Sequence, residues 1–316
     1  MFLSNGKLYT GQDMCEGYDY IPNPETGETM AVSRATGEVS DTVPVPVGSL
    51  IYTPEDLERI NERKLKQKEF LERKRSSEEL GKFSFMEAGG GGLSTLKPAT
   101  IARLAYLSTY LRFGTNCLYR TQRTPMCKDD LPEVMHLSVS TVDRFWKEVS
   151  PGYLNTDDAG NLILCGDSFI HGSLQKGEEC GRYTKIYTDT IRNLYRTTAT
   201  SNHKQLGYIF LMLPYINIEY NALCYNPFET DSEEIVYMTV SEFCKAIGHS
   251  YATSHRLRKA YSEITFDVEG KKELFCAFVY DGIHEEKAKI FINPRIIYSG
   301  SRWEKVALLA SFCKSE

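Results

Sequence analysis

The chain has 316 residues, of which 41% are hydrophobic and 25% are charged, a composition typical of a globular protein with a sizeable core. Its net charge of −5 argues against a protein that coats nucleic acid indiscriminately, so any DNA-binding cations have to be concentrated locally. The sequence has no run apolar enough to span a bilayer and no charged start followed by an apolar core, so we expect neither a membrane span nor a signal peptide; its nine cysteines include no C-x-x-C pair. We expect two or three domains in a cytoplasmic protein with reduced cysteines.

Residues 1–52 are rich in Gly, Pro, Thr and Tyr and predict an N-terminal arm or small β segment. Thr53 and Pro54 then signal a helix that is expected to run to about residue 79. Residues 58–75 carry eight Lys/Arg against four Glu, so the net charge is 8 − 4 = +4. Three interpretations stay open for this charged helix: a solvated connector, a partner-binding or dimerising helix, and a basic helix on DNA phosphates. With the Gly-rich linker 89–92 it forms a predicted segment 53–97.

A first domain is predicted over 98–180. Pro98 opens a helix with core-like apolar spacing, and residues 131–150 have the form of a helix-turn-helix. In its second helix the apolar residues gather on one side, whereas Ser140, Arg144 and Lys147 fall on the opposite side, with Thr141 beside them. These groups can contact phosphates and base edges when a helix enters the major groove. An ordinary solvated face is the alternative.

Two further elements are expected before the next domain. Residues 160–165 and 168–170, joined by Gly166 and Asp167, predict a β-hairpin of the kind called a wing. Residues 181–202 predict a basic linker helix, because residues 181–204 carry five Lys/Arg against one Asp, a net charge of 5 − 1 = +4. Arg182, Arg192 and Arg196 are its candidate phosphate ligands.

The sequence also contains an internal repeat. Residues 101–120 align with 206–225, where Tyr110 pairs with Tyr215 at an offset of 215 − 110 = 105, and residues 140–150 align with 252–262 at an offset of 252 − 140 = 112. Leu164-Cys165 is matched with Phe275-Cys276. The repeat predicts a second domain over 203–316 that ends in a helix.

The second recognition helix of this repeat carries more positive charge than the first. Arg256 and Lys259 take the outward places of Arg144 and Lys147, and Thr253, His255 and Arg258 flank them. Residues 238–262 have a net charge of 4 − 1 = +3, whereas residues 126–149 have 3 − 5 = −2. We therefore expect the second copy to bind phosphates more strongly.

Two passages resemble known families. The helix-turn-helix with its hairpin resembles the winged-helix domains of MarR-type regulators, and residues 289–300, KIFINPRIIYSG, resemble the end of the wing in replication initiators of Firmicute plasmids. Both matches are short, and neither covers residues 1–90. The resemblance implies a plasmid or phage protein that acts on duplex DNA at a replication origin. Here, however, two winged helices would lie in one chain.

The expected fold is therefore α+β and mainly helical, with two tandem winged helices, the N-terminal arm and the long charged helix. The six histidines have no metal-ligand spacing, the acidic pairs 129–130 and 157–158 are better explained by helix starts and loops, and no nucleophile motif is present. We expect neither an enzyme nor a metal or cofactor site.

The expected function is sequence-specific binding of double-stranded DNA by a replication initiator. Alternatives are a transcriptional regulator at an operator and a winged-helix protein–protein adaptor that binds no DNA. Expected partners are double-stranded DNA and a second copy or other protein bound through helix 53–79, but no membrane. The candidate DNA-binding residues are Ser140, Thr141, Arg144, Lys147, Thr253, His255, Arg256, Arg258, Lys259, Arg182, Arg192, Arg196, Lys271, Lys272 and Arg295.

Overall fold

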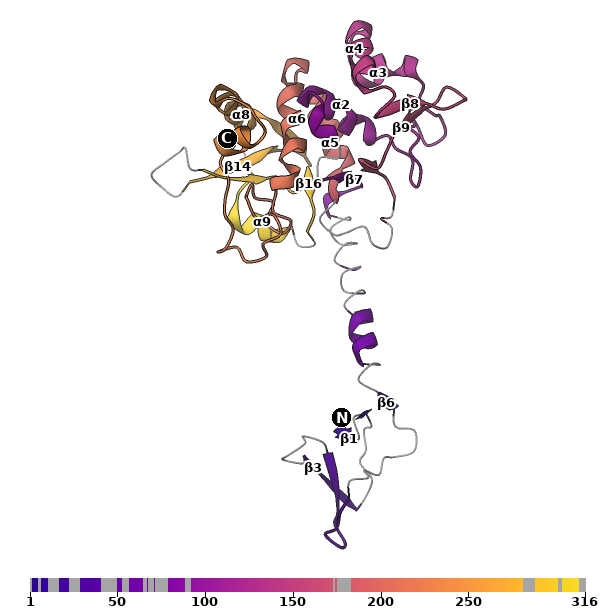
Figure 1. Cartoon of the computed structure of the whole chain (residues 1–316), viewed down its shortest axis with the longest axis vertical. Coiled ribbons are helices and arrows are strands. Elements are labelled where there is room, and N and C mark those ends of the chain that lie inside the picture. Colours follow the sequence, from indigo (N-terminus) through magenta and orange to yellow (C-terminus); the bar gives the residue numbers. More distant parts are fainter. Residues whose placement is uncertain are drawn as a thin grey trace. The chain divides into compact units, whose positions relative to one another are not determined.

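The computed structural model describes residues 2–4, 7–10, 17–22, 29–40, 50–52, 57–64, 67, 71, 79–88, 92–172, 174, 183–280, 288–300 and 303–312. They form an α+β structure of helices and small antiparallel sheets, which confirms the expected fold class at that level. The chain divides into two units, residues 1–72 and 73–316 (Figure 1).

The first unit contains two three-stranded antiparallel sheets with strand orders β1-β2-β6 and β3-β4-β5. The strands are β1 (Phe2–Ser4), β2 (Lys7–Thr10), β3 (Tyr18–Pro22), β4 (Thr29–Ser33), β5 (Val39–Ser40) and β6 (Leu50–Tyr52). Ala31 is the one fully buried side chain among those described in this unit. Residues 57–64, 67 and 71 are helical, and the other positions of the predicted charged helix up to residue 78 lie outside the described residues.

The second unit contains a four-stranded antiparallel sheet of order β10-β7-β11-β16. Its strands are β7 (Phe83–Glu87), β10 (Phe169–Ile170), β11 (Tyr183–Tyr187) and β16 (Ile297–Tyr298). All five residues of β11 are buried, including Lys185, whose Nζ lies 3.4 Å from the carbonyl oxygen of Gly300. The expected linker helix 181–202 is therefore wrong over 183–187, where aromatic and β-branched residues favour a buried strand. The helix α5 (Thr188–Thr197) follows, and then the short helix η3 (Thr200–Asn202).

Two modules of this unit share the order of one helix, two further helices and a β-hairpin. The first module comprises α2 (Pro98–Ser108), η2 (Lys128–Asp130), α3 (Leu131–Met135), α4 (Val139–Val149), β8 (Leu154–Thr156) and β9 (Leu162–Leu164). The second comprises α6 (His203–Met212), η4 (Leu213–Tyr215), α7 (Val240–Ala246), α8 (Tyr251–Glu263), β12 (Thr265–Val268), β13 (Lys271–Leu274), β14 (Cys276–Val279) and β15 (Lys289–Ile292). The short helix η1 (Leu93–Thr95) precedes α2, and α9 (Glu304–Leu309) follows β16.

Equivalent backbone contacts relate the two modules at the offsets that the sequence predicts. At the offset of 105, the bridge Leu111↔Leu118 recurs as Ile216↔Leu223, and the hydrogen bond from Tyr119 to Tyr110 recurs between Cys224 and Tyr215. At the offset of 112, the capping box of Cys127 and Asp130 recurs as Thr239 and Glu242. The turn bond from Leu137 N to Pro132 O likewise recurs from His249 N to Cys244 O. The repeat is therefore a repeat of structure as well as of sequence.

The hairpins correct two sequence-based expectations. In the first module β9 pairs with β8, whereas Phe169 and Ile170 pair with β7 in the four-stranded sheet, so the predicted hairpin 160–165/168–170 is wrong. The turn falls instead at Asp157, whose carboxylate accepts hydrogen bonds from the backbone of Ala159 and Asn161.

The predicted match of Leu164 with Phe275 is also wrong. Leu164 N donates to Asn116 O, and the equivalent bond runs from Ile292 N to Asn221 O, so Leu164 corresponds to Ile292 in β15. The match fails because a hairpin, β12–β13, is inserted between α8 and β14.

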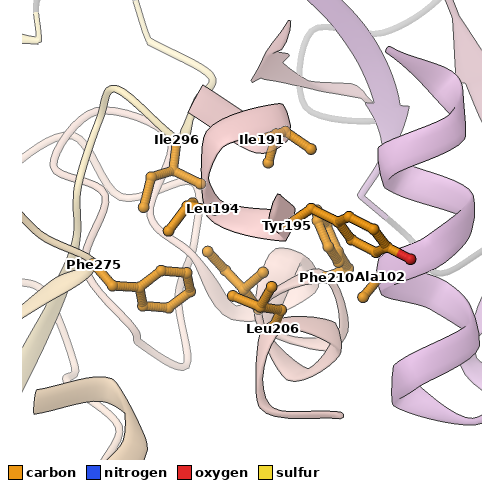
Figure 2. Close-up of a pocket in the computed structure, with 9 residues that line it drawn as sticks. Ala102, Ile191, Leu194, Tyr195, Leu206, Phe210, Phe275 and Ile296 are labelled. Atoms are coloured by element: carbon orange, nitrogen blue, oxygen red, sulfur yellow. The ribbon is translucent and has the colours of Figure 1, made fainter. Parts of the chain in front are cut away.

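The first helices of the two modules, α2 and α6, pack against each other, with α3 and α4 to one side and α8 and β14 to the other (Figure 1). Gly207 makes this crossing possible, because a Cβ there would lie 1.7 Å from the carbonyl oxygen of Pro98. Next to the crossing, apolar side chains from α2, α5 and α6 converge with Phe275 and Ile296 on a small apolar pocket (Figure 2). The modules therefore share a continuous core.

Candidate nucleic-acid interface

Helices α4 and α8 begin in the same way. Ser138 and Ser250 are the residues ahead of the two helices, and each carbonyl accepts a hydrogen bond of 2.9 Å from the backbone N–H three residues later. The preceding turn needs a left-handed residue, which is His136 (φ 53°) in the first module and Gly248 (φ 74°) in the second. Both helices thus begin after a turn of the same kind.

The inner faces of α4 and α8 follow helical spacing and are buried. Val142, Phe145 and Val149 are at most 3% exposed, and Ser254, Leu257 and Tyr261 are at most 4% exposed. The nine positions 141–149 have the same burial classes, in order, as the positions 253–261. The two helices therefore present equivalent faces to the core and to solvent.

Two cations stand on the outer face of each helix. Arg144 and Lys147 of α4 are exposed, as are Arg256 and Lys259 of α8. An arginine in this setting can bind a guanine edge or a phosphate through two parallel hydrogen bonds, and a lysine can bind a phosphate. The predicted exposure of these four side chains is confirmed.

The outer faces differ in charge and in local contacts. Position 143 in α4 is an aspartate, whereas the equivalent position in α8 is His255, and both are exposed. Arg144 is partly engaged by its own helix, with Nε 3.3 Å from Ser140 O and Nη2 3.3 Å from Thr141 Oγ1. Arg256 and Lys259 of α8 have no such contacts with described residues. This difference favours α8 for anion binding.

Several predicted phosphate ligands are used inside the protein. Arg192 donates from Nε to Thr109 Oγ1 (2.9 Å) and from Nη2 to Thr109 O (2.7 Å), and its guanidinium lies 4.1 Å from the ring centre of Tyr110. It therefore holds the end of α2. Arg196 reaches the hydroxyls of Tyr106 and Tyr110. Burial raises the pKa of Tyr106 to about 12, so this tyrosine stays neutral.

Two arginines of the second module also have internal contacts. Arg258 donates to the hydroxyl of Tyr280 (3.2 Å) and lies over that ring and the ring of Phe278. Arg295 forms an ion pair of 3.3 Å with Glu273 and a hydrogen bond to the carbonyl oxygen of Glu79. Both residues position loops and hairpins. Arg182, a further predicted ligand, lies outside the described residues.

The fold brings together a set of residues that sequence reasoning did not group. Arg256 and Lys259 of α8 line a groove with Lys272 of the inserted hairpin and with polar residues of the segment 197–205, which runs from the end of α5 to the start of α6 and is called the α5–α6 connection. Glu263, Thr265 and Asp267 also line the groove, and its polar members between the end of α5 and the start of α6 are Thr197, Thr198, Asn202 and Gln205. These last four carry no charge and follow no periodic pattern, so the sequence offered no signal for them. Lys271, the neighbour of Lys272, does not line the groove.

Within the described part of the chain, no three His, Cys, Asp or Glu side chains gather into a metal-binding group. None of the described helices combines the length and apolar character needed to cross a membrane. Comparisons with protein-family models, with curated proteins and with solved structures give no match.

Proposed function

We propose that the two modules are winged helices and that the chain binds double-stranded DNA with α4 and α8 as recognition helices. The order of helix, bridging strand, two helices and hairpin in each module supports this assignment. The observation that carries the proposal is the exposed Arg/Lys pair at equivalent positions of two helices whose burial patterns coincide. Packing of the core does not explain these outward cations, whereas binding to the phosphates of a DNA backbone does.

Binding to a random duplex at increasing salt concentration tests the proposal. A protein that neutralises Z phosphates loses affinity with a slope of about −0.9 Z in a plot of log K against log salt. The unmodified chain is expected to show a steep slope. The variant Arg256→Ala/Lys259→Ala is expected to reduce the steepness by about 2, because two ionic contacts are removed.

A matched control removes two positive charges elsewhere. Arg34, which pairs with Asp19 on the surface of the first unit, and Lys82, which is exposed ahead of β7, are suitable for Arg34→Ala/Lys82→Ala. This control should leave the slope unchanged. DNA binding is contradicted if the unmodified chain binds no duplex, or if both double variants lose the same affinity.

Replication initiation is the role that we propose first, on the resemblance of residues 289–300, and control of transcription at an operator is the close alternative. Selection of bound sequences from a random duplex pool, followed by footprinting, separates the two roles. An initiator should occupy repeated sites and open an adjacent AT-rich stretch. A repressor should occupy one operator and leave its flanks paired.

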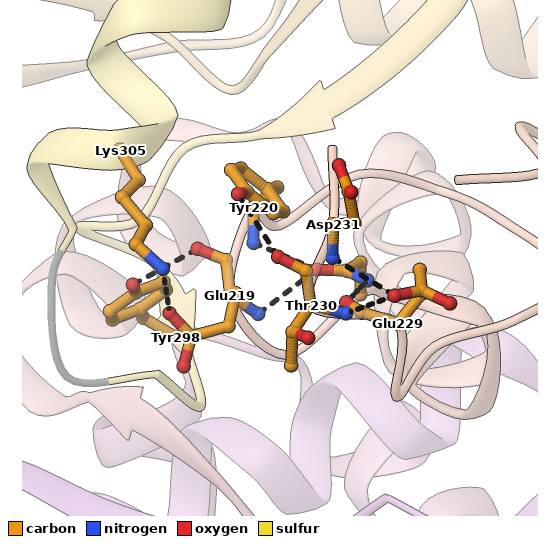
Figure 3. Close-up of polar contacts among 8 residues, drawn as sticks. Glu219, Tyr220, Glu229, Thr230, Asp231, Tyr298 and Lys305 are labelled. Carbon is orange, nitrogen blue, oxygen red and sulfur yellow. Dashed lines mark hydrogen bonds and ion pairs between the residues drawn. The ribbon is translucent and has the colours of Figure 1, made fainter. Parts of the chain in front are cut away.

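A protein–protein adaptor is a second candidate, and the loop Tyr225–Val236 favours it. This loop carries four carboxylates and no Lys or Arg, and it exposes Tyr225 (53%), Phe228 (63%) and Val236 (56%). Figure 3 shows its anchoring: the Tyr220 hydroxyl donates to Thr230 O, and Glu229 Oε1 accepts from the backbone of Thr230 and Asp231. A fixed acidic loop with exposed apolar groups suits a basic protein surface better than DNA. An adaptor of this kind would bind no random duplex at any salt concentration.

A further inference from the structure

A groove of about 500 Å³ lies beside α8 in the second module. One wall is α8, with Arg256 and Lys259, and a second wall is the β12–β13 hairpin, with Lys272. The α5–α6 connection closes the remaining side with hydroxyl and amide side chains. The cations of the recognition helix therefore face a concave surface.

The cations of this groove have no partners within the described chain. Arg256, Lys259 and Lys272 form no side-chain hydrogen bond or ion pair with described residues, although Glu263 and Asp267 also line the groove. Among the described lining residues, three cations against two carboxylates leave an excess of 3 − 2 = +1. Unpaired cations that converge from two elements are suited to an anion with several charges.

The hairpin that builds the second wall exists in one module alone. Four residues, 150–153, join α4 to β8, whereas fourteen, 262–275, join the equivalent positions of α8 and β14, so the insertion is 14 − 4 = 10 residues. Its turn at Glu269 (φ 49°) and Gly270 (φ 81°) is a tight two-residue turn, which holds the strands in register and fixes the place of Lys272. The insertion thus adds a cation at a defined position opposite α8.

We propose that this groove binds the phosphodiester backbone of one nucleic-acid strand, with Arg256, Lys259 and Lys272 on its phosphates. This inference rests on the proposed DNA binding and deepens it. Among the described residues of the lining there is no aromatic side chain on which a base could stack, so these residues favour contact with the backbone, independent of base sequence. The hydroxyl of Thr198 and the amide nitrogens of Asn202 and Gln205 can donate uncharged hydrogen bonds to phosphate and sugar oxygens, whereas the Thr197 hydroxyl donates to Asn193 O in its own helix.

Two adjacent lysines give a matched test. Neighbouring residues of a strand point to opposite faces, and Lys272 lines the groove whereas Lys271 does not, although both are exposed and both belong to β13. Lys272→Ala should weaken duplex binding by about fivefold to tenfold at 0.1 M salt and reduce the salt slope by about 1. Lys271→Ala should leave both quantities near those of the unmodified chain. Equal effects of the two variants would overturn the groove assignment.

Removal of negative charge gives a test of opposite sign. Glu263→Gln/Asp267→Asn takes two carboxylates out of the lining at nearly constant volume, so it should tighten binding and steepen the salt slope. Unchanged or weaker binding would contradict the proposal. Thermal unfolding of all variants checks that the hairpin stays folded.

Titration with three ligands shows whether the groove binds the phosphates of a duplex, of a single strand or of a small free anion. The unmodified chain is titrated with a random duplex, with a single strand of the same length and with inorganic pyrophosphate. If Lys272→Ala weakens binding of the duplex or of the single strand, the assignment of the groove as a backbone-binding site is supported. Binding of pyrophosphate with no effect of Lys272→Ala on either nucleic acid contradicts it.

The same data separate this inference from the proposed function. If the unmodified chain binds no nucleic acid, the proposed function fails. If it binds and Arg256→Ala/Lys259→Ala weakens binding while Lys272→Ala does not, the proposed function stands and the groove alone fails.

Discussion

The two modules of the second unit are built on one set of backbone hydrogen bonds but differ in what is attached to it. The bridges recur at an offset of 105, and the capping boxes and the turn before α4 and α8 recur at an offset of 112. All three length differences make the second module longer. The loop between the bridges is 12 − 5 = 7 residues longer (225–236 against 120–124), and the inserted hairpin adds 10. The hairpin loop is 11 − 5 = 6 residues longer (279–289 against 157–161).

This comparison shows where such a fold tolerates change. A lost hydrogen bond in the buried bridges leaves unsatisfied polar groups, each at a cost of about 1–3 kcal/mol. Extra residues at a surface turn cost little, because the entropy of closing a loop grows slowly with its length. The additions change the chemistry of the surface: one is an acidic loop, and another supplies Lys272 opposite α8. The insertions therefore change which groups the surface of the second module presents.

The largest expected effects concern positions where the modules are not interchangeable. Asn221, with φ 54°, is buried and donates from Nδ2 to the carbonyl oxygens of Ile292 (2.9 Å) and Ile297 (2.8 Å). Asn221→Ala should lower the free energy of unfolding by about 2–4 kcal/mol, because two buried carbonyls lose their partner. The equivalent Asn116 is exposed, so Asn116→Ala should cost less than about 0.5 kcal/mol. Urea unfolding measures both, and similar losses would contradict this contrast.

The crossing of α2 and α6 should also resist substitution. Gly207→Ala places a methyl group against the backbone of Pro98, which cannot move aside as a flexible side chain could. We expect a loss of about 3 kcal/mol in unfolding free energy. Gly152 has open space around its Cα, and a Cβ there would lie 4.0 Å from the carbonyl oxygen of Val149, so Gly152→Ala serves as the control and should change stability little. If Gly207→Ala is equally mild, the two helices do not cross as closely as described.

The expected loss of DNA-binding affinity, compared between the two modules, is of intermediate size. Arg256→Ala/Lys259→Ala should weaken duplex binding by about 1–3 kcal/mol, and Arg144→Ala/Lys147→Ala by less. Asp143 and the contacts of Arg144 with its own helix reduce what α4 can offer to an anion. Fluorescence anisotropy with one duplex at fixed salt measures the difference. A larger loss from the first pair would reverse our ranking of the modules.

The smallest expected effect comes from the two capping boxes. Hydrogen bonds from the Thr239 backbone lower the pKa of Glu242, and hydrogen bonds from Cys127 and Arg120 lower that of Asp130 against the effect of burial. Because each folded-state pKa lies below the unfolded one, the stabilisation is present above the unfolded pKa and is lost as the pH falls through the folded one. Glu242→Gln should cost about 1 kcal/mol at pH 7 and less in acid, below the ordinary value of 4.5. A loss that does not depend on pH would contradict this assignment.

Part of the candidate site could be predicted from the sequence. A period of 3.6 residues places Val142 and Phe145 on the opposite side of α4 from Arg144 and Lys147, whatever the helix packs against. The same reasoning holds for α8. The offsets of 105 and 112 could be found because identical residues mark them, and the backbone contacts bear them out.

Other features could not be predicted, because they depend on residues far apart in the chain. The basic residues of 181–202 suggested a surface helix, but Lys185 lies in a central strand and Arg192 holds the end of α2. Phe169 and Ile170 form a plausible hairpin with their neighbours in sequence, yet their partner is β7, more than eighty residues earlier. Strand pairing is fixed by which distant segments can bury their faces together, and local propensity does not contain that information.

The sequence by itself determined the period of the helices, the capping residues, the duplication and the sides of α4 and α8 that meet water, since all of these follow from spacing along the chain. The tertiary structure alone decided which of the described cations are used inside the protein and which have no partner among the described residues. It also decided that Lys272 faces Arg256 and Lys259 across a groove. The reason is that a charged side chain finds its partner by distance in space, and that distance exists only after the segments have packed.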